Sequence, residues 1–322
     1  MTGAAMPGAA ATRSDRLWTV AQVVAFAATL VLLLGMLRTP DTALGVLWNV
    51  LIPLVPASLL ISPQLWRNVC PLATANMATN GLVGNRIPSE KAMRVAASGG
   101  MVLLLVLVPA RRFVFNTNGP ALALTVVAVV VAALVLGAVF DAKAGFCNAV
   151  CPVLPVERLY GQRPLLQLGN PRCPRCTLCS VKGCIDLSPQ KAVQAALGRK
   201  GRSHGWLITP FGAFAAGFPG FVLGYFRAVD GPLSSAGAVY LEVFAWMAAS
   251  YILTVLIVRL FGVGSDRMMP ALAAAAAALY YWFAAPSLAD FAGLPQGVAV
   301  ALQVAFLTLV AVWYGRGLRA RA

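Results

Sequence analysis

The chain has 322 residues, of which 60% are hydrophobic and 11% are charged, and its mean hydropathy is +0.79. This composition excludes an ordinary soluble domain and indicates an integral membrane protein. The formal net charge of +15 does not indicate a nucleic-acid-binding protein, because the basic residues lie between apolar stretches and form no single patch.

Eight apolar segments predict membrane-spanning helices, each of which needs about 20 mostly apolar residues. In chain order the expected spans are 17–37, 43–61, 95–109, 121–140, 206–226, 239–263, 271–285 and 298–314. The third and the seventh are the shortest, and the Ala-rich seventh is the weakest candidate. The first is too long for the core of a signal peptide, so it predicts a span. We therefore expect an all-α polytopic membrane protein with about eight transmembrane helices.

One long polar segment separates the fourth and fifth expected spans, and it divides the chain into five parts. These are an N-terminal tail at 1–16, a four-helix membrane unit at 17–140, the polar segment at 141–205, a second membrane unit at 206–315 and a C-terminal tail at 316–322. We expect the polar segment to be small, irregular and ferredoxin-like, because it holds most of the cysteines.

The basic residues predict the orientation of the chain in the membrane. If the N-terminus is cytoplasmic, 21 of the 25 Lys and Arg residues fall on the cytoplasmic side, and only Arg38, Arg111, Arg112 and Arg227 fall elsewhere. Short cytoplasmic loops carry an excess of Lys and Arg. The bias predicts a multi-pass protein of a bacterial inner membrane with both termini in the cytoplasm.

All seven cysteines fall on this predicted cytoplasmic side: Cys70, Cys147, Cys151, Cys173, Cys176, Cys179 and Cys184. The cytoplasm is reducing, so structural disulfides are disfavoured there. An odd number of clustered cysteines is more typical of metal ligands.

The most specific pattern is the run Cys173-Pro-Arg-Cys176-Thr-Leu-Cys179, which Cys184 follows after four residues. Three thiolates at this spacing suit three irons of a [4Fe–4S] cluster, and a fourth cysteine completes the cluster or serves a neighbouring one. The spacing does not decide which role Cys184 has. The alternative is a zinc site, which more often uses two separated Cys-x-x-Cys pairs.

A second pattern, Phe146-Cys147-Asn148-Ala149-Val150-Cys151-Pro152, follows the fourth expected span. Two thiols four residues apart share one face if the helix continues for a turn, and the proline then ends that helix. The alternative is a pair of inert, buried cysteines.

A third pattern, Trp66-Arg67-Asn68-Val69-Cys70-Pro71, matches the second at Val-Cys-Pro and has Trp66 where the second has Cys147. Each copy follows the second helix of a pair, which indicates a duplicated unit of two spans and one Cys-Pro motif. A chance match of three residues is the alternative. If the duplication is real, Cys70, Cys147 and Cys151 form a second centre or complete the first.

These motifs resemble the polytopic membrane iron–sulfur proteins of the NapH/NosR type, which carry paired CxxxCP motifs after membrane helices and ferredoxin-like cysteine runs. The resemblance covers about residues 43–190. It departs from the family at Trp66 and in having one cysteine run instead of two. It implies electron transport in support of a partner oxidoreductase and no catalytic reaction of its own. We expect quinol or ferredoxin as a further partner.

Other features suggest little further chemistry. His204 is the single histidine, and one loop histidine does not provide the axial pair of a haem b. Glu242 is the one carboxylate well inside an expected span, which suits either a quinol site or a structural role near the interface. The main competing function is metal handling during maturation of another redox enzyme, since soft thiolates also bind copper(I). A transporter with a regulatory metal loop is a third class.

Overall fold

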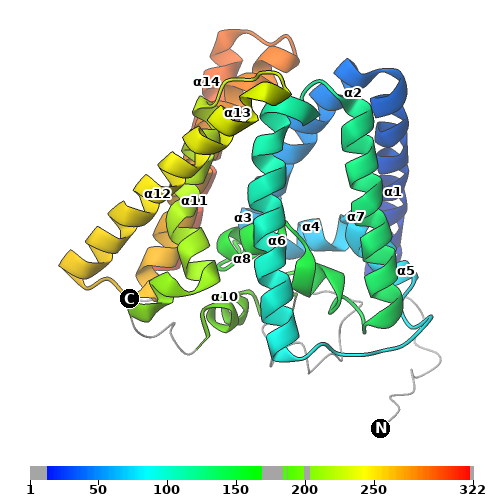
Figure 1. The fold of residues 1–322 in the computed structure, drawn as a ribbon, viewed down its shortest axis with the longest axis horizontal. Helices are drawn as coiled ribbons and strands as arrows, with labels where there is room; N and C mark the ends of the chain where they lie inside the picture. Colours follow the sequence, from blue (N-terminus) through cyan, green and yellow to red (C-terminus); the bar gives the residue numbers. More distant parts are fainter. Residues whose placement is uncertain (1–12, 169–183, 187, 199–203, 320–322) are drawn as a thin grey trace.

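The computed structural model describes residues 13–168, 184–186, 188–198 and 204–319 as a bundle of helices (Figure 1). Within these residues the sole β-type pairing is an isolated bridge between Arg86 and Phe140. Cys173, Cys176 and Cys179, like the basic residues Arg172, Arg175 and Lys182, lie outside the described residues.

The first membrane unit contains four crossings. They are α1 (Arg13–Arg38), a bent second crossing, α6 (Glu90–Ala110) with η2 (Arg111–Phe115), and α7 (Gly119–Val139). The second crossing consists of α2 (Pro40–Val46), η1 (Leu47–Leu51) and α3 (Ile52–Ile61). A π-helical turn and a proline inside α3 at Pro56 account for this bend, since both disturb the regular hydrogen-bond ladder.

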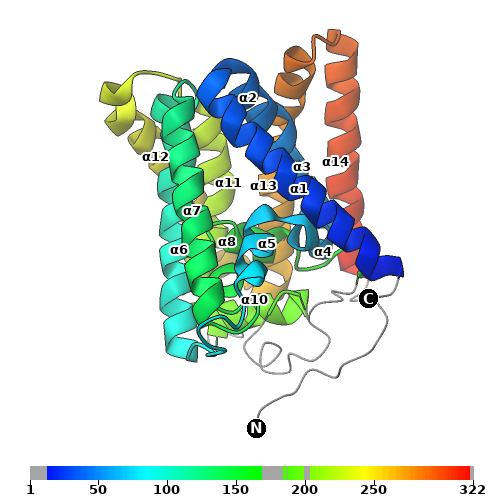
Figure 2. The same ribbon diagram turned by 90° about the vertical axis from the view of Figure 1, so that its right-hand side faces the viewer.

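Short elements gather toward one end of the bundle, among the lower halves of the long helices in Figure 1. They are α4 (Pro63–Val69), α5 (Pro71–Ala78), η3 (Phe146–Val150), α8 (Leu154–Tyr160), α10 (Pro189–Leu197) and η5 (His204–Ile208). The start of α1 and the end of the last helix lie at this same end (Figure 2). We call it the cysteine end, because Cys70, Cys147, Cys151 and Cys184 all lie there.

The second membrane unit consists of α11 (Pro210–Arg227), η6 (Leu233–Ser235), α12 (Ala236–Phe261), α13 (Ser265–Phe291) and α14 (Gln296–Arg319). Several polar contacts join it to the first unit, including the following two. Tyr281 donates a hydrogen bond to the Pro53 carbonyl at 2.7 Å. At the opposite end from the cysteines, Arg112 forms a 2.8 Å ion pair with Asp230.

Seven helices of the described chain are long and apolar enough to cross a membrane. They are Arg16–Arg38, Pro40–Ile61, Glu90–Phe115, Gly119–Val139, Leu233–Phe261, Ser265–Phe291 and Gln296–Leu318. Both of the short expected spans are therefore full-length helices. The expected fifth span, α11, is not among the seven.

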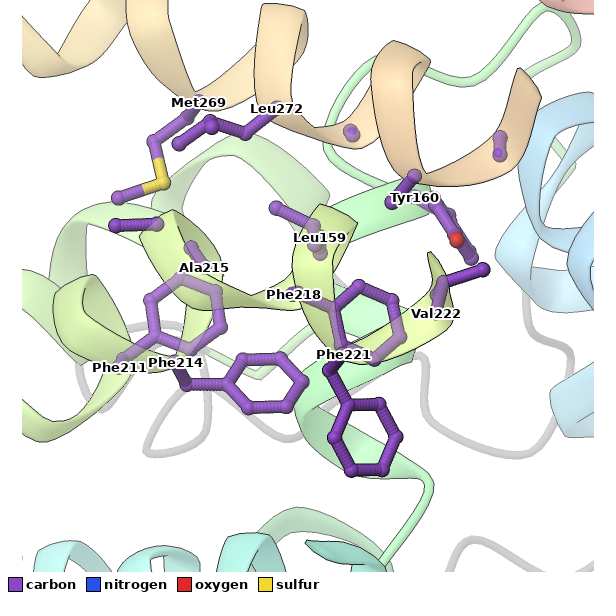
Figure 3. Packing of buried hydrophobic residues seen from close by; sticks show 14 of the residues in the cluster. Leu159, Tyr160, Phe211, Phe214, Ala215, Phe218, Phe221, Val222, Met269 and Leu272 are labelled. Atoms are coloured by element: carbon purple, nitrogen blue, oxygen red, sulfur yellow. The ribbon is translucent and has the colours of Figure 1, made fainter. Parts of the chain in front are cut away.

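The helix α11 is instead the buried centre of the second unit. It has 18 residues, of which 13 are buried, and it packs against α6, α12 and α13. Figure 3 shows its Phe214, Phe218 and Phe221 packed beside Leu159 and Tyr160 of α8. Because α11 begins beside η5 and ends near Arg112, it still connects the two ends of the bundle.

A glycine makes the closest helix contact of this unit possible. A Cβ atom on Gly220 would lie 1.9 Å from the Trp246 carbonyl oxygen of α12. Small residues at such positions let two helices approach closely. This contact lets α11 pack closely against α12 at the centre of the unit.

Candidate thiol-lined metal site

Two Cys-Pro steps with nearly the same backbone geometry build the site. Cys70 links α4 to α5 with φ −55° and ψ 122°, and Cys151 links η3 to α8 with φ −55° and ψ 124°. A proline disfavours the α conformation of the residue before it, so each cysteine ends a helix. The next helix begins directly after Cys70 and three residues after Cys151. The local sequence thus fixes both thiols at helix junctions.

The second motif departs from the single α-helical turn expected between Cys147 and Cys151. Residues 146–150 form a wider π-helical turn, and the amide of Cys151 donates to the Phe146 carbonyl at 3.1 Å. In the first motif the amide of Cys70 donates to Trp66, one residue closer in sequence, at 2.8 Å. Pro152 fixes Cys151 outside the helix. The π-helical turn before it contains one more residue between donor and acceptor than the α-helical turn before Cys70.

Three of the predicted thiols line one small cavity. Cys70, Cys147 and Cys151 share it with Arg67, Glu157, Leu72, Ala73 and Phe146. Its volume is about 10 Å³, which suffices for a single water molecule. Trp66 stands at the position that matches Cys147, but its side chain packs against the hydrophobic core. The cavity therefore has three thiols rather than four.

A buried ion network surrounds these thiols. Arg67 is 3% exposed, and its guanidinium pairs with Glu157 and, at 2.8 Å, with Asp186. Lys143 lies 3.6 Å from the Asp186 carboxylate and donates to the Arg67 carbonyl at 3.1 Å. Two buried cations are thus paired with two buried carboxylates. Such pairing offsets the cost of removing each charge from water.

This network also ties Cys184 to the two Cys-Pro motifs. Asn148 accepts a hydrogen bond from Arg67 at 2.9 Å and donates one to the Cys184 sulfur at 3.3 Å. Asp186, two residues after Cys184, accepts two hydrogen bonds from Arg67. Cys184 therefore lies beside Asn148, the residue that follows Cys147 in the chain.

Burial holds the three cavity thiols in the neutral form. It raises the pKa of Cys147 to about 12, against the opposing effect of Arg67 and Lys143. It also raises the pKa of Cys70 and, together with the charge of Glu157, that of Cys151. A metal that binds these sulfurs would have to displace their protons.

Two arginines near the cysteines have shifted pKa values. Burial acts to lower the pKa of Arg67, but the charges of Asp186 and Glu157 outweigh it and raise that pKa. Burial and the charge of Arg67 lower the pKa of Arg158 to about 10. The Arg158 Nε has no hydrogen-bond partner within the described residues.

The two motifs are related by an approximate twofold arrangement. The helix after each Cys-Pro step packs against the second helix of the other copy: α5 against α7, and α8 against α3. Likewise α1 packs against α4 and α5, while α6 packs against η3 and α8. The matched residues Arg67 and Asn148 are also in contact, through a hydrogen bond.

The thiol ligands suit a soft metal, but the cavity between them is too small for a cubane cluster. Thiolates suit iron–sulfur clusters, zinc and copper(I). Among the described side chains, however, no three ligand-type groups are close enough together to hold a metal ion. A cubane has eight atoms, so a cavity the size of one water would have to widen to hold it.

Sequence reasoning missed the ion network. Glu157 and Asp186 lie 90 and 119 residues from Arg67, and no local motif connects them.

Other residues of interest in the sequence lie outside the thiol cavity. The side chain of Glu242, noted as an intramembrane carboxylate, is 40% exposed and lies 3.5 Å from Arg227, so it forms a peripheral ion pair. His204 begins η5, and Arg163 lies in a separate pocket.

The chain matches no protein-family model, no curated protein and no solved structure.

Proposed function

We propose that this protein is a membrane-bound electron-transfer protein with iron–sulfur chemistry on the cytoplasmic face of a bacterial inner membrane. In this proposal a [4Fe–4S] cluster is held by Cys173, Cys176, Cys179 and Cys184. The thiols of Cys70, Cys147 and Cys151 form a second centre or complete the first. The protein passes electrons to or from a partner oxidoreductase, with quinol or ferredoxin as donor.

The observation that carries the proposal is the meeting of three separate cysteine motifs. Thiols from two motifs about 80 residues apart line one cavity, and Asn148 links that cavity to Cys184. Inert cysteines in a hydrophobic core usually lie among apolar residues, whereas these lie beside a buried arginine, a buried lysine and two carboxylates. Cationic surroundings stabilise thiolates and anionic clusters.

The chain's own residues have distinct parts in this function. Arg67 and Lys143 offset the negative charge that arises when Cys147 loses its proton. Leu72, Ala73 and Phe146 limit the access of water to the cavity. A cluster, when bound, supplies reversible one-electron transfer, and its potential depends on the hydrogen bonds and charges around its sulfurs.

The cytoplasmic orientation rests on the distribution of basic residues. The cysteine end is also the end at which α1 begins and α14 ends. The excess of Lys and Arg at this end supports a cytoplasmic location. The resemblance of the motifs to NapH/NosR-type proteins supports the same orientation and a partner redox enzyme, and it stands as part of the proposal.

Metal handling is the second candidate function, and the size of the cavity favours it. A space for one water among three thiols is closer to the needs of a single copper(I) ion than to those of a cubane. Such a protein would load or reduce the metal of another enzyme instead of relaying electrons.

Metal and sulfide analysis of the anaerobically purified protein separates the two functions. Iron and acid-labile sulfide near four per chain or above support the electron-transfer proposal. Copper or zinc without sulfide would overturn it and favour metal handling.

A further inference from the structure

A second pocket at the cysteine end is larger than the thiol cavity and has a different character. It has a volume of about 610 Å³, which is within the usual range for small-ligand sites. Its wall is formed by the loop after α8, by α10, by the first turn of α13 and by the last turns of α14. None of the cysteines of the described chain lines it.

The charged lining of this pocket is mostly basic. Arg163, Lys191 and Arg316 face a single acidic residue, Asp266. Gln162, Gln167, Gln190 and Gln194 add amide groups. In the part of the chain that the structure describes, neither Lys191 nor Arg316 forms a salt bridge. The pocket therefore holds positive charge that the described side chains do not neutralise.

One of these cations is held in place by the fold. Arg163 donates from Nη1 to the Gly317 carbonyl at 2.6 Å and from Nη2 to the Asp266 carbonyl at 3.4 Å. These bonds connect the loop after α8 to both α13 and α14. The 27-residue helix α13 also begins in the pocket wall, and the start of a helix favours an anion.

The pocket lies at the edge of the membrane-spanning region. Ser265 is the first residue of the candidate membrane-spanning helix Ser265–Phe291, and Arg316 lies two residues before the end of the candidate Gln296–Leu318. Beside the pocket, Leu166 and Leu318 are about half exposed, at 54% and 46%. A basic pocket between membrane helices with apolar surface beside it is the usual setting for an anionic lipid headgroup.

We propose that this pocket binds a phosphate-bearing anion. Arginine guanidinium groups and lysine ammonium groups are the side chains that phosphate oxygens prefer, and glutamine amides complete the donor set. The phosphate belongs either to the headgroup of an acidic phospholipid or to a soluble phosphate compound. This inference goes beyond the proposed electron transfer and does not depend on it.

The test compares Lys191→Gln/Arg316→Gln with the matched control Arg94→Gln/Arg259→Gln. Both double variants remove two charges from exposed residues at the cysteine end, but only the first changes the pocket. The full-length protein is titrated with phosphatidylglycerol in a phosphatidylcholine nanodisc and, separately, with inorganic pyrophosphate in detergent. Thermal unfolding without a probe checks the fold, and Lys191→Gln alone serves if the double variant unfolds.

The pocket variant should bind at least one probe about 10- to 30-fold more weakly than the wild type, while the control stays within about twofold. A loss limited to phosphatidylglycerol identifies a lipid headgroup, and a loss limited to pyrophosphate identifies a soluble phosphate. A loss with both probes indicates a site open to either source. Equal affinities of wild type and pocket variant for both probes, or an equal loss in the control, would overturn the proposal.

Discussion

Arg67 and Asn148 occupy matching positions in the two Cys-Pro motifs, and a 2.9 Å hydrogen bond joins them at the centre of the buried ion network. The bond connects one Cys-Pro motif to the other. Through the other end of its amide, Asn148 also reaches the sulfur of Cys184 at 3.3 Å. One residue pair therefore lies between all three cysteine motifs.

Replacement of Arg67 should strongly destabilise the protein. Arg67→Met leaves the carboxylates of Glu157 and Asp186 buried without their main partner. Breaking a buried pair from one side costs about 3–5 kcal/mol. Thermal or denaturant unfolding measures the effect. The control Arg227→Met removes an exposed pair with Glu242 and should cost about 1 kcal/mol or less. Similar losses in both variants would contradict the role of the network.

The contact between α6 and the second motif can be tested with two neighbouring glycines. A Cβ atom on Gly100 would lie 2.7 Å from the Val150 carbonyl oxygen and 2.9 Å from that of Cys151. Gly100→Ala should therefore displace the motif, cost about 1–3 kcal/mol and lower the bound metal per chain. At Gly99 a Cβ would meet nothing within 4 Å.

Gly99→Ala, one residue away in the same helix, is the matched control for this prediction. It should be neutral or stabilise the helix by up to about 1 kcal/mol, with the metal content unchanged. A loss of metal in both variants would show that the effect comes from α6 in general and not from the carbonyl contacts.

The site was partly predictable from the sequence. Apolar segments near 20 residues long identified the crossings, because the bilayer fixes that length. Pro71 and Pro152 identified the helix junctions, because a proline restricts the residue before it. The expected span 271–285 is shorter than α13 because Asp266, Arg267 and two prolines interrupt the apolar pattern, while the helix itself continues through them.

The remaining features depend on tertiary contacts that a single sequence does not contain. Asp186 lies in the polar segment like many surface acids, and only the fold brings it to Arg67, 119 residues away. The motif alignment places Trp66 at the position of the proposed ligand Cys147. The neighbouring helices, however, determine that the Trp66 side chain packs against the hydrophobic core and not into the cavity. The burial of α11 likewise follows from its packing and not from its own hydropathy.

The metal-free protein should lose stability as the pH rises above about 8.5. Burial raises the pKa of Cys147 to about 12, whereas a free thiol titrates near about 8.5. Between these values the folded protein retains a proton that the unfolded chain releases. The free energy of unfolding then falls by up to about 1.4 kcal/mol per pH unit for each such thiol.

Denaturant unfolding of the metal-free protein between about pH 8 and about pH 10 measures this slope. Cys147→Ala removes one of the buried thiols, so its stability should decline less steeply over that range. Parallel slopes for the wild type and Cys147→Ala would mean that Cys147 does not carry a raised pKa.

The charge beside Cys184 should set the reduction potential of the proposed cluster. Asn148→Asp keeps an acceptor for Arg67 but places a carboxylate beside the Cys184 sulfur. A negative neighbour disfavours the more negative, reduced state, so the midpoint potential should fall by some tens of millivolts, where about 59 mV is a tenfold change for one electron. A redox titration with an EPR readout measures the shift. An unchanged potential would separate Asn148 from the cluster.

The most direct test of the central claim is the EPR spectrum of the anaerobically reduced protein, recorded for the wild type, Cys184→Ser and Cys151→Ser. We expect a reducible iron–sulfur signal in the wild type. Loss or alteration of one spectral component in each variant would assign Cys184 and Cys151 as ligands. Two results would contradict the account. One is a wild-type protein with no reducible signal, and the other is a protein that contains iron and sulfide but whose spectrum is the same in the wild type and both variants.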